Sequence, residues 1–166
     1  MKAFVYIMIG IIVFYLDTLI GLVIPFHIGN LTFILVPHLT LMYLLLLSIY
    51  RPFMVTLLLS IFLGMITDIY FGSVYGLYLF GYIFLITIFN KFLKIFYRDY
   101  IMVYWFSIIG VMILEIFVAI IYSVISYVEF DLLNFILLRI IPTLILNIIL
   151  LIILMPIFFK FFKKPI

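Results

Sequence analysis

The chain has 166 residues, of which 71% are hydrophobic and 9% are charged. A soluble domain cannot bury that much apolar surface, so the composition predicts an integral membrane protein. The net charge of +3 comes from 9 Lys and Arg residues against 6 Asp and Glu residues. Because the basic residues are scattered, nucleic-acid binding is excluded. Cysteine is absent, which excludes disulfides and thiolate metal sites.

Six apolar segments follow one another along the chain, and each is expected to form a transmembrane helix. The expected helices lie at about residues 3–24, 32–50, 53–70, 75–89, 100–128 and 132–159. About 20 apolar residues are needed to cross a hydrocarbon core roughly 30 Å thick, and these segments are of that order. The fold class is therefore predicted to be all-α, with a single polytopic membrane domain over residues 1–166.

The first two segments contain the signals that set their ends. The first has the positive start and apolar run of a signal peptide, but no small-x-small cleavage site follows. It is therefore expected to stay as a spanning helix that ends at Pro25. After a short loop at 26–31, Pro37 and His38 interrupt the outer part of the second segment. Its regular portion is expected to start near Pro37.

The third segment and the turn after it hold the most informative residues. Small and polar side chains recur at four-residue spacing on one helix face, at Thr56, Ser60, Gly64 and Asp68. In lipid, small residues let another helix approach closely. A carboxylate at membrane depth costs at least about 2.5 kcal/mol and needs a partner. We expect Asp68 to fix the outer turn by capping backbone donors near Gly72, with direct contact to a partner protein as the alternative. Gly72 and Gly76 supply flexible backbone for that turn.

In the second half of the chain, fewer residues mark where one segment ends and the next begins. A polar break at 90–99 separates the fourth and fifth segments and could form a short amphipathic helix at the membrane surface. In the sixth segment Arg139, Thr143 and Asn147 recur at four-residue spacing and so share one face. Pro142 is expected to kink this helix.

The basic residues indicate which side of the membrane each loop faces. All of them except Arg139 fall on one side of the expected topology: Lys2, Arg51, Lys91, Lys94, Arg98, Lys160, Lys163 and Lys164. The opposite loops contain Glu129 and Asp131 but no Lys or Arg. By the positive-inside rule, both termini are expected to be cytoplasmic. The basic segments are expected to contact anionic lipid.

Four ionisable residues from four expected helices lie at a similar depth. Counted at about 1.5 Å per residue, Asp17, Asp68 and Glu115 each lie roughly 20 Å from the inner boundary, and Arg139 reaches a similar level. One hypothesis is a shared buried cluster in which Arg139 is the common donor. The alternative is that each residue is satisfied separately by backbone contacts, water or the interface.

No pattern of catalytic residues is found. The sequence lacks a nucleophile elbow, a zinc-binding helix motif and a phosphate-binding glycine loop. His27 is isolated and His38 lies beside a helix start, so a structural role is favoured over metal binding for both. Proton relay by buried carboxylates and an aromatic ligand pocket stay open as minor alternatives. We therefore predict that the protein is not an enzyme and that it has no catalytic, metal-binding or cofactor-binding residue.

Three stretches of the chain resemble one bacterial family. They are VPHLT at 36–40, Arg51-Pro52 at the inner turn, and the glycine–aspartate pattern GMITDIYFGSVYGLYLFG at 64–81. These residues resemble the family of the rod shape-determining protein MreD, and the length, six spans and cytoplasmic ends agree. The resemblance gives structural or partner-contact roles to six residues: Pro37, Arg51, Gly64, Asp68, Gly72 and Gly76.

The resemblance implies a non-enzymatic component of the cell-elongation machinery in the bacterial cell membrane, involved in rod-shape determination and in regulation of peptidoglycan synthesis. It implies a scaffold that acts with the bitopic protein MreC and, through it, with the MreB filament, the RodA glycosyltransferase and a penicillin-binding transpeptidase. The family's fold is similar to that of the substrate-binding subunits of energy-coupling-factor vitamin transporters. The alternative function is therefore a small-molecule binder in an importer, although the short outer loops argue against a closed pocket.

Overall fold

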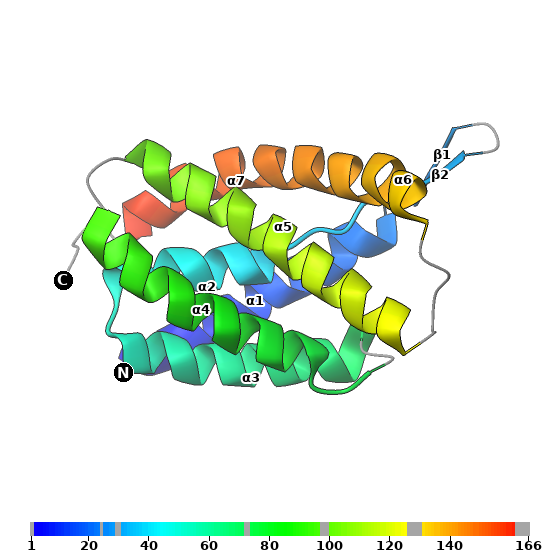
Figure 1. Ribbon diagram of the computed structural model, residues 1–166. Coiled ribbons are helices and arrows are strands. Elements are labelled where there is room, and N and C mark those ends of the chain that lie inside the picture. Colours follow the sequence, from blue (N-terminus) through cyan, green and yellow to red (C-terminus); the bar gives the residue numbers. More distant parts are fainter. Residues whose placement is uncertain are drawn as a thin grey trace.

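The structure is a computed structural model that describes residues 2–23, 25–28, 31–71, 74–96, 100–125 and 131–161. Its elements in chain order are α1 (Lys2–Val23), β1 (Pro25–Ile28), β2 (Leu31–Ile34), α2 (Leu39–Tyr50), α3 (Phe53–Phe71), α4 (Leu77–Phe96), α5 (Tyr100–Val124), α6 (Leu132–Phe135), the π-helical turn η1 (Ile136–Ile140) and α7 (Ile141–Phe161). The long helices form a bundle, and α1 begins at the same end of it at which α7 ends (Figure 1). The β1–β2 hairpin projects from the other end. We call these the termini end and the hairpin end.

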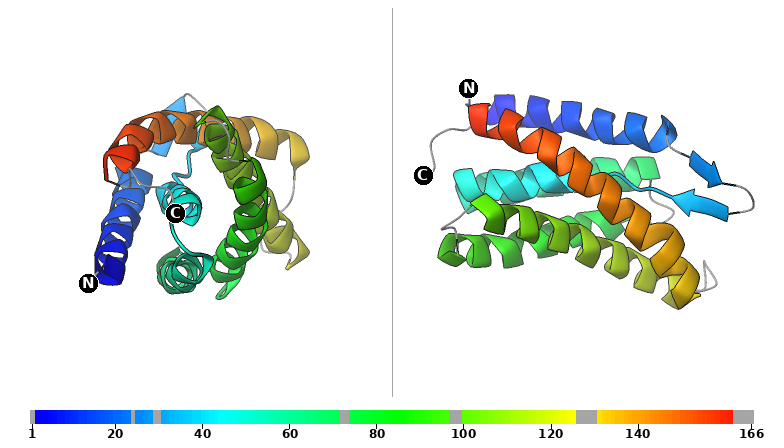
Figure 2. Two further views of the ribbon diagram at one scale, coloured as in Figure 1. Left: turned by 90° about the vertical axis from the view of Figure 1, so that its left-hand side faces the viewer. Right: turned by 90° about the horizontal axis from the view of Figure 1, so that it is seen from above.

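The shortest of the apolar helices occupies the centre of the bundle. Viewed from the termini end, α2 lies inside a ring that includes α1, α3, α4 and α7 (Figure 2). Every residue of α2 except Ile49 is buried, as expected for a helix that is apolar on all sides. Its 12 residues give a length of only about 18 Å. The chain from β2 to α2, residues 35–38, therefore enters the bundle as non-helical backbone (Figure 1).

The prediction for residues 25–38 is wrong in its detail. In place of a loop at 26–31 and a helix from residue 32, strands β1 and β2 pair antiparallel, with Phe26 opposite Phe33. Aromatic and β-branched residues favour strands, and the residue before a proline is disfavoured in the α conformation. The helix accordingly begins at Leu39, two residues after Pro37, and β1 and β2 are the strands among the described residues, whose other regular elements are helices.

The last segment is one continuous helical path with a local change of pitch. A single helix at about 132–159 was predicted, with a kink at Pro142. The path instead comprises α6, η1 and α7, and the π-helical turn ends two residues before Pro142. A proline has no backbone N–H, and its ring clashes with the carbonyl four residues earlier. Here that residue is Leu138, inside η1, so the wider turn lies where the proline disturbs the helix.

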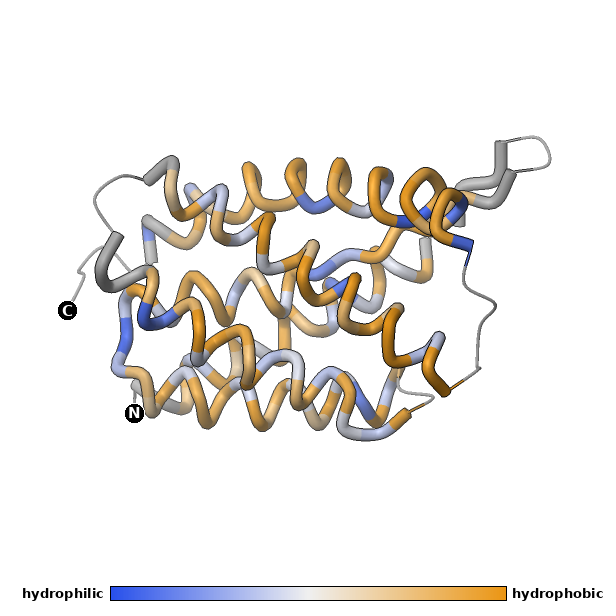
Figure 3. Tube along the Cα trace, in the orientation of Figure 1, coloured by the Kyte–Doolittle hydropathy of each residue, from blue (hydrophilic) through white to orange (hydrophobic). Residues whose placement is uncertain are grey.

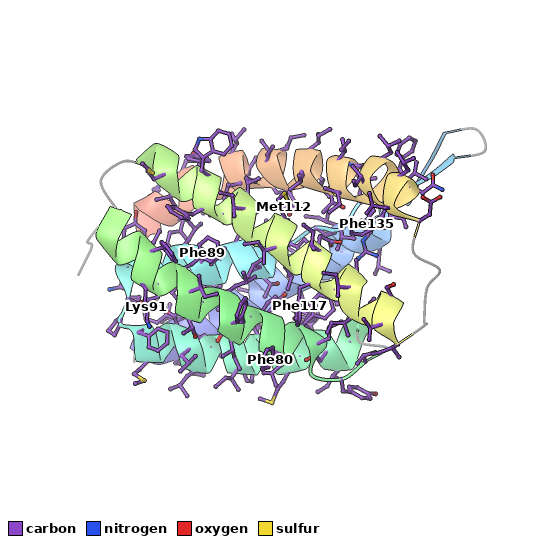
Figure 4. All side chains as sticks on the ribbon, viewed as in Figure 1. Phe80, Phe89, Lys91, Met112, Phe117 and Phe135 are labelled. Carbon is purple, nitrogen blue, oxygen red and sulfur yellow. The ribbon has the colours of Figure 1, made fainter. Side chains whose placement is uncertain are left out.

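Two further boundaries differ from the prediction. α4 continues to Phe96, so the expected amphipathic helix at 90–99 is, as far as residue 96, the last part of α4. α5 ends at Val124, short of the predicted residue 128, and Glu129 lies outside the described residues. On the outside of the bundle, the exposed ring of Phe80 of α4 stacks on Phe117 of α5, with ring centroids 6.5 Å apart (Figure 4).

The described helices are those of a multi-pass membrane protein. Four stretches are long and apolar enough to cross a membrane: Phe4–Leu22, Phe53–Phe71, Met102–Val124 and Leu132–Phe158. Two shorter apolar helices lie at Leu39–Tyr50 and Leu77–Phe92. Figure 3 shows hydrophobic residues along all the helices, with hydrophilic residues at the helix ends and at a few interior points. Among the described residues, length and composition therefore support four of the six predicted spans, and the shorter helices leave the other two as a prediction.

Candidate functional site

Asp17, in the last part of α1, binds the start of the central helix. Its carboxylate accepts hydrogen bonds from the backbone N–H of Leu39 at 2.9 Å and of Thr40 at 3.0 Å, and from the Thr40 hydroxyl at 2.8 Å. The first N–H groups of a helix have no partner within it, and negative charge is favourable there. His38, at the N-cap position of α2, makes no side-chain cap. Asp17 thus caps α2 from a neighbouring helix.

Asp68 does the same for α4. Its two carboxylate oxygens accept hydrogen bonds from the backbone N–H of Tyr78 at 2.8 Å and of Leu79 at 2.9 Å. The preceding turn contains Gly76, whose φ of 92° is costly for any residue with a side chain. Capping was expected near Gly72, which lies outside the described residues. The donors are found a few residues later, in the first turn of α4.

Glu115 stands at the centre of a buried ionic triad. Its Oε2 lies 2.7 Å from Nε of Arg139, and its Oε1 lies 2.7 Å from Nε2 of His38. The Glu115 side chain is 2% exposed and that of Arg139 is 23% exposed. The three residues come from α5, from the π-helical turn and from the residue before α2. An unpaired charge at membrane depth is costly. The two donors offset the cost of burying the Glu115 carboxylate.

The hypothesis of one four-residue cluster is therefore wrong in its membership, and its alternative, separate backbone contacts, holds for Asp17 and Asp68. The structure brings Glu115 and Arg139 together, but the carboxylates of Asp17 and Asp68 bind the ends of two different helices. Both aspartates accept hydrogen bonds from backbone N–H groups at helix starts. A count of depth in the membrane does not consider such groups. His38 joins the cluster although it was not predicted to. The available signal was its position beside Pro37, at the interruption of the second segment.

The non-helical backbone at 35–38 is held by α7. The side-chain amide of Asn147 donates to the carbonyl of Val36 at 2.8 Å, and its oxygen accepts from the N–H of His38 at 2.8 Å. The Thr143 hydroxyl donates to the carbonyl of Ile34 and accepts from the N–H of Val36, both at 3.2 Å. In a membrane such backbone is tolerated only when protein or water satisfies it. Sequence spacing placed both side chains on one face but did not identify what they bind.

Three other candidates have packing or ring contacts. A Cβ on Gly64 would lie 2.7 Å from Cα of Leu79, so only glycine allows α3 and α4 to approach so closely. At the termini end, the guanidinium of Arg51 lies over the ring of Tyr6, 5.1 Å from its centroid, a favourable cation–π geometry. Pro37 lines a cavity near the hairpin end.

That cavity has a volume of about 330 Å³. It lies among the end of α1, the segment at 35–38, the end of α3, the start of α4 and the π-helical turn. Polar side chains in its wall include Asp17, His38, Tyr78 and Arg139, beside apolar ones such as Phe71. Within the described part of the chain, no three His, Asp or Glu residues are grouped as metal ligands.

Comparison with known proteins gives one match. The family model described as rod shape-determining protein MreD matches residues 1–165. Neither the curated proteins nor the solved structures contain a match to the chain. The expected likeness to vitamin-transporter subunits therefore stays a prediction.

Proposed function

Because the chain belongs to the family of the rod shape-determining protein MreD, we propose that it acts as a non-enzymatic scaffold of the cell-elongation machinery. In this proposal the protein lies in the plasma membrane with six spans and both termini in the cytoplasm. Its direct partner is MreC, and through MreC it is linked to MreB, RodA and a penicillin-binding transpeptidase. Its effect is to regulate where peptidoglycan is made.

The observation that carries the proposal is how the buried ionisable side chains are used. Asp17 and Asp68 cap helices, and Glu115 binds both Arg139 and His38. Each of these carboxylates is therefore committed to holding helices together, whereas a catalytic acid or base has to reach a substrate. Fixed helices suit a protein that works by presenting surfaces to other membrane proteins.

The charge distribution supports the proposed orientation. Lys91 is exposed near the termini end, where Arg51 also lies (Figure 4). At the other end, Asp131 is exposed at the start of α6. Basic residues are retained on the cytoplasmic side of membrane proteins, so the termini end is the cytoplasmic end in this proposal, and it faces anionic lipid.

Co-purification from the native host tests the scaffold role. The protein is tagged at one end, extracted from membranes in mild detergent and isolated, and bound proteins are identified by mass spectrometry. We expect MreC to be enriched, and RodA and the transpeptidase to be recovered only while MreC is present. Recovery of RodA at the same level from cells without MreC would contradict the proposed order of contacts.

The cavity favours a second candidate function, that of a substrate-binding subunit in a small-molecule importer. Its 330 Å³ are at the lower end of the range for ligand sites. This function predicts a transport ATPase module among the co-purified proteins. It also predicts that depletion creates a growth requirement that one added vitamin relieves. The scaffold role predicts neither result.

A further inference from the structure

We propose that the cavity beside Arg139 binds a phosphate group, carried either by a lipid headgroup or by a free phosphate compound. The cavity opens among α1, the segment at 35–38, α3, α4 and the π-helical turn, and the scaffold role neither requires nor explains it. The inference rests on the hydrogen-bonding groups in the cavity wall and does not depend on the proposed partners.

The guanidinium of Arg139 is only partly used by the protein. Its Nε donates to Oε2 of Glu115 at 2.7 Å, and it makes no other hydrogen bond to the described residues. The two terminal amino groups, with four N–H donors, are left available. Arg139 lines the cavity, and its side chain is 23% exposed. A guanidinium whose terminal amino groups make no hydrogen bond within the described residues, on a residue that lines a cavity, is suited to phosphate oxygens.

The carboxylate that lines the cavity, by contrast, is occupied. The oxygens of Asp17 accept three hydrogen bonds from the start of α2. Glu115, whose oxygens are bound by His38 and Arg139, is not among the residues that line the cavity. The cavity thus has the free amino groups of Arg139 beside a carboxylate that is already bound, which favours a ligand that brings acceptor oxygens.

A second donor lies on another wall. Tyr78 of α4 lines the cavity, and its hydroxyl makes no hydrogen bond to the described part of the chain. Its backbone is fixed, because Asp68 accepts from its N–H at 2.8 Å. Arg139 and Tyr78 therefore present donors from two elements. The tetrahedral oxygens of a phosphate can bind donors on separate walls, whereas the two oxygens of a carboxylate lie in one plane.

The test uses the full chain in a maltoside detergent, freed of phospholipid. Thermal unfolding is followed while inorganic phosphate, dioleoyl-phosphatidylglycerol or dioleoylglycerol is added. Native mass spectrometry counts the lipids that are retained. Dioleoylglycerol has the same acyl chains without the phosphate and serves as the lipid control.

Two results would support the proposal and would identify the source of the phosphate. Saturable stabilisation by inorganic phosphate indicates a site that a free compound can reach. Retention of one phosphatidylglycerol, with no effect of inorganic phosphate, indicates a lipid headgroup. In either case Arg139→Lys, which keeps a charge beside Glu115 but loses the paired amino groups, should weaken binding by roughly tenfold or more.

Two variants make the assignment to this cavity specific. Arg51→Lys is the same change at the termini end and should leave binding unaltered. Tyr78→Phe removes only the hydroxyl, so it tests the cavity even if Arg139→Lys fails to fold. The proposal is overturned if the wild type shows no saturable phosphate effect and retains both lipids equally. It is also overturned if folded Arg139→Lys and Tyr78→Phe bind as the wild type does.

Discussion

Asp17 and Asp68 have one function at two places in the bundle. Each carboxylate comes from a helix packed alongside and accepts the first backbone N–H groups of the next helix, at the starts of α2 and α4. The cost of placing a carboxylate at membrane depth is offset because the same contact satisfies donors that would otherwise be unpaired. The sequence separation is 22 residues in one case and 10 in the other.

Substitution of Asp68 tests this function. Asp68→Asn keeps one good acceptor and should lower the free energy of unfolding by about 1 kcal/mol, whereas Asp68→Ala should lower it by about 2 kcal/mol. Asp131, an exposed cap of the short helix α6, is the control, because water can replace it. Asp131→Ala should cost about 0.5 kcal/mol or less. Unfolding in increasing SDS measures all three, and equal losses for Asn and Ala at residue 68 would contradict the capping role.

The Glu115–Arg139 pair should behave as a coupled unit. Glu115→Leu and Arg139→Leu each leave a buried charge without its partner and should cost about 3–5 kcal/mol. The double variant should cost less than the sum, with a coupling energy of about 1–3 kcal/mol. Lys91→Leu, at an exposed position, should change the free energy of unfolding by no more than about 0.5 kcal/mol. Strict additivity in the same SDS titration would show that the pair does not interact.

Residues of the site that bind an oppositely charged side chain could be predicted from the sequence, but residues that bind backbone groups could not be predicted from depth. Matching depth in the membrane pointed to Glu115 and Arg139, because two opposite charges in lipid seek each other. The same count placed Asp17 and Asp68 in that cluster wrongly, since it ignores backbone donors. For His38, its position beside Pro37 favoured a structural role, but one histidine at a helix start does not identify its partner.

At the level of elements, the segment at 35–38 depends on two side chains of α7. Asn147→Leu would leave the N–H of His38 and the carbonyl of Val36 buried without partners. The expected loss is about 2–6 kcal/mol, from two groups that each cost about 1–3 kcal/mol. Thr87→Val is the control, because that hydroxyl donates to the carbonyl of Ile83 in its own helix. If Asn147→Leu lowered the free energy of unfolding by no more than Thr87→Val does, α7 would not hold the segment at 35–38 through Asn147.

The α3–α4 contact makes a prediction for two glycines. A Cβ at Gly64 would meet the backbone of Leu79 at 2.7 Å, but one at Gly21 would lie 3.7 Å from the ring of Pro37. Gly64→Ala should therefore cost about 1–3 kcal/mol, since backbone must move. Gly21→Ala should be neutral or slightly stabilising. Thermal unfolding of both variants measures the difference, and equal midpoints would show that the helices can separate freely.

The positions of the helices could be predicted where a long apolar run alone determines them. The long apolar runs of α1, α3 and α5 were expected close to their observed positions. The hairpin was missed because two four-residue strands beside a proline look like a loop joined to an apolar helix. The π-helical turn was missed because Pro142 signals a disturbance but not its form.

For the whole molecule, polar contacts from three helices meet around the start of α2. α1 caps it through Asp17, α5 reaches His38 through Glu115, and α7 holds the preceding backbone through Asn147. Three surrounding helices thus fix the short central helix, and this gives the bundle a defined shape. That shape is what the proposed scaffold presents to MreC.

The central claim is that this protein determines cell shape as a fixed scaffold. The most direct measurement is cell width and the position of new wall synthesis in the native host, after depletion and re-expression of wild type, Asn147→Leu or Thr87→Val at equal levels. We predict wide or rounded cells on depletion, and rescue by wild type and Thr87→Val but not by Asn147→Leu. Normal width and normal wall insertion after confirmed depletion would contradict the account.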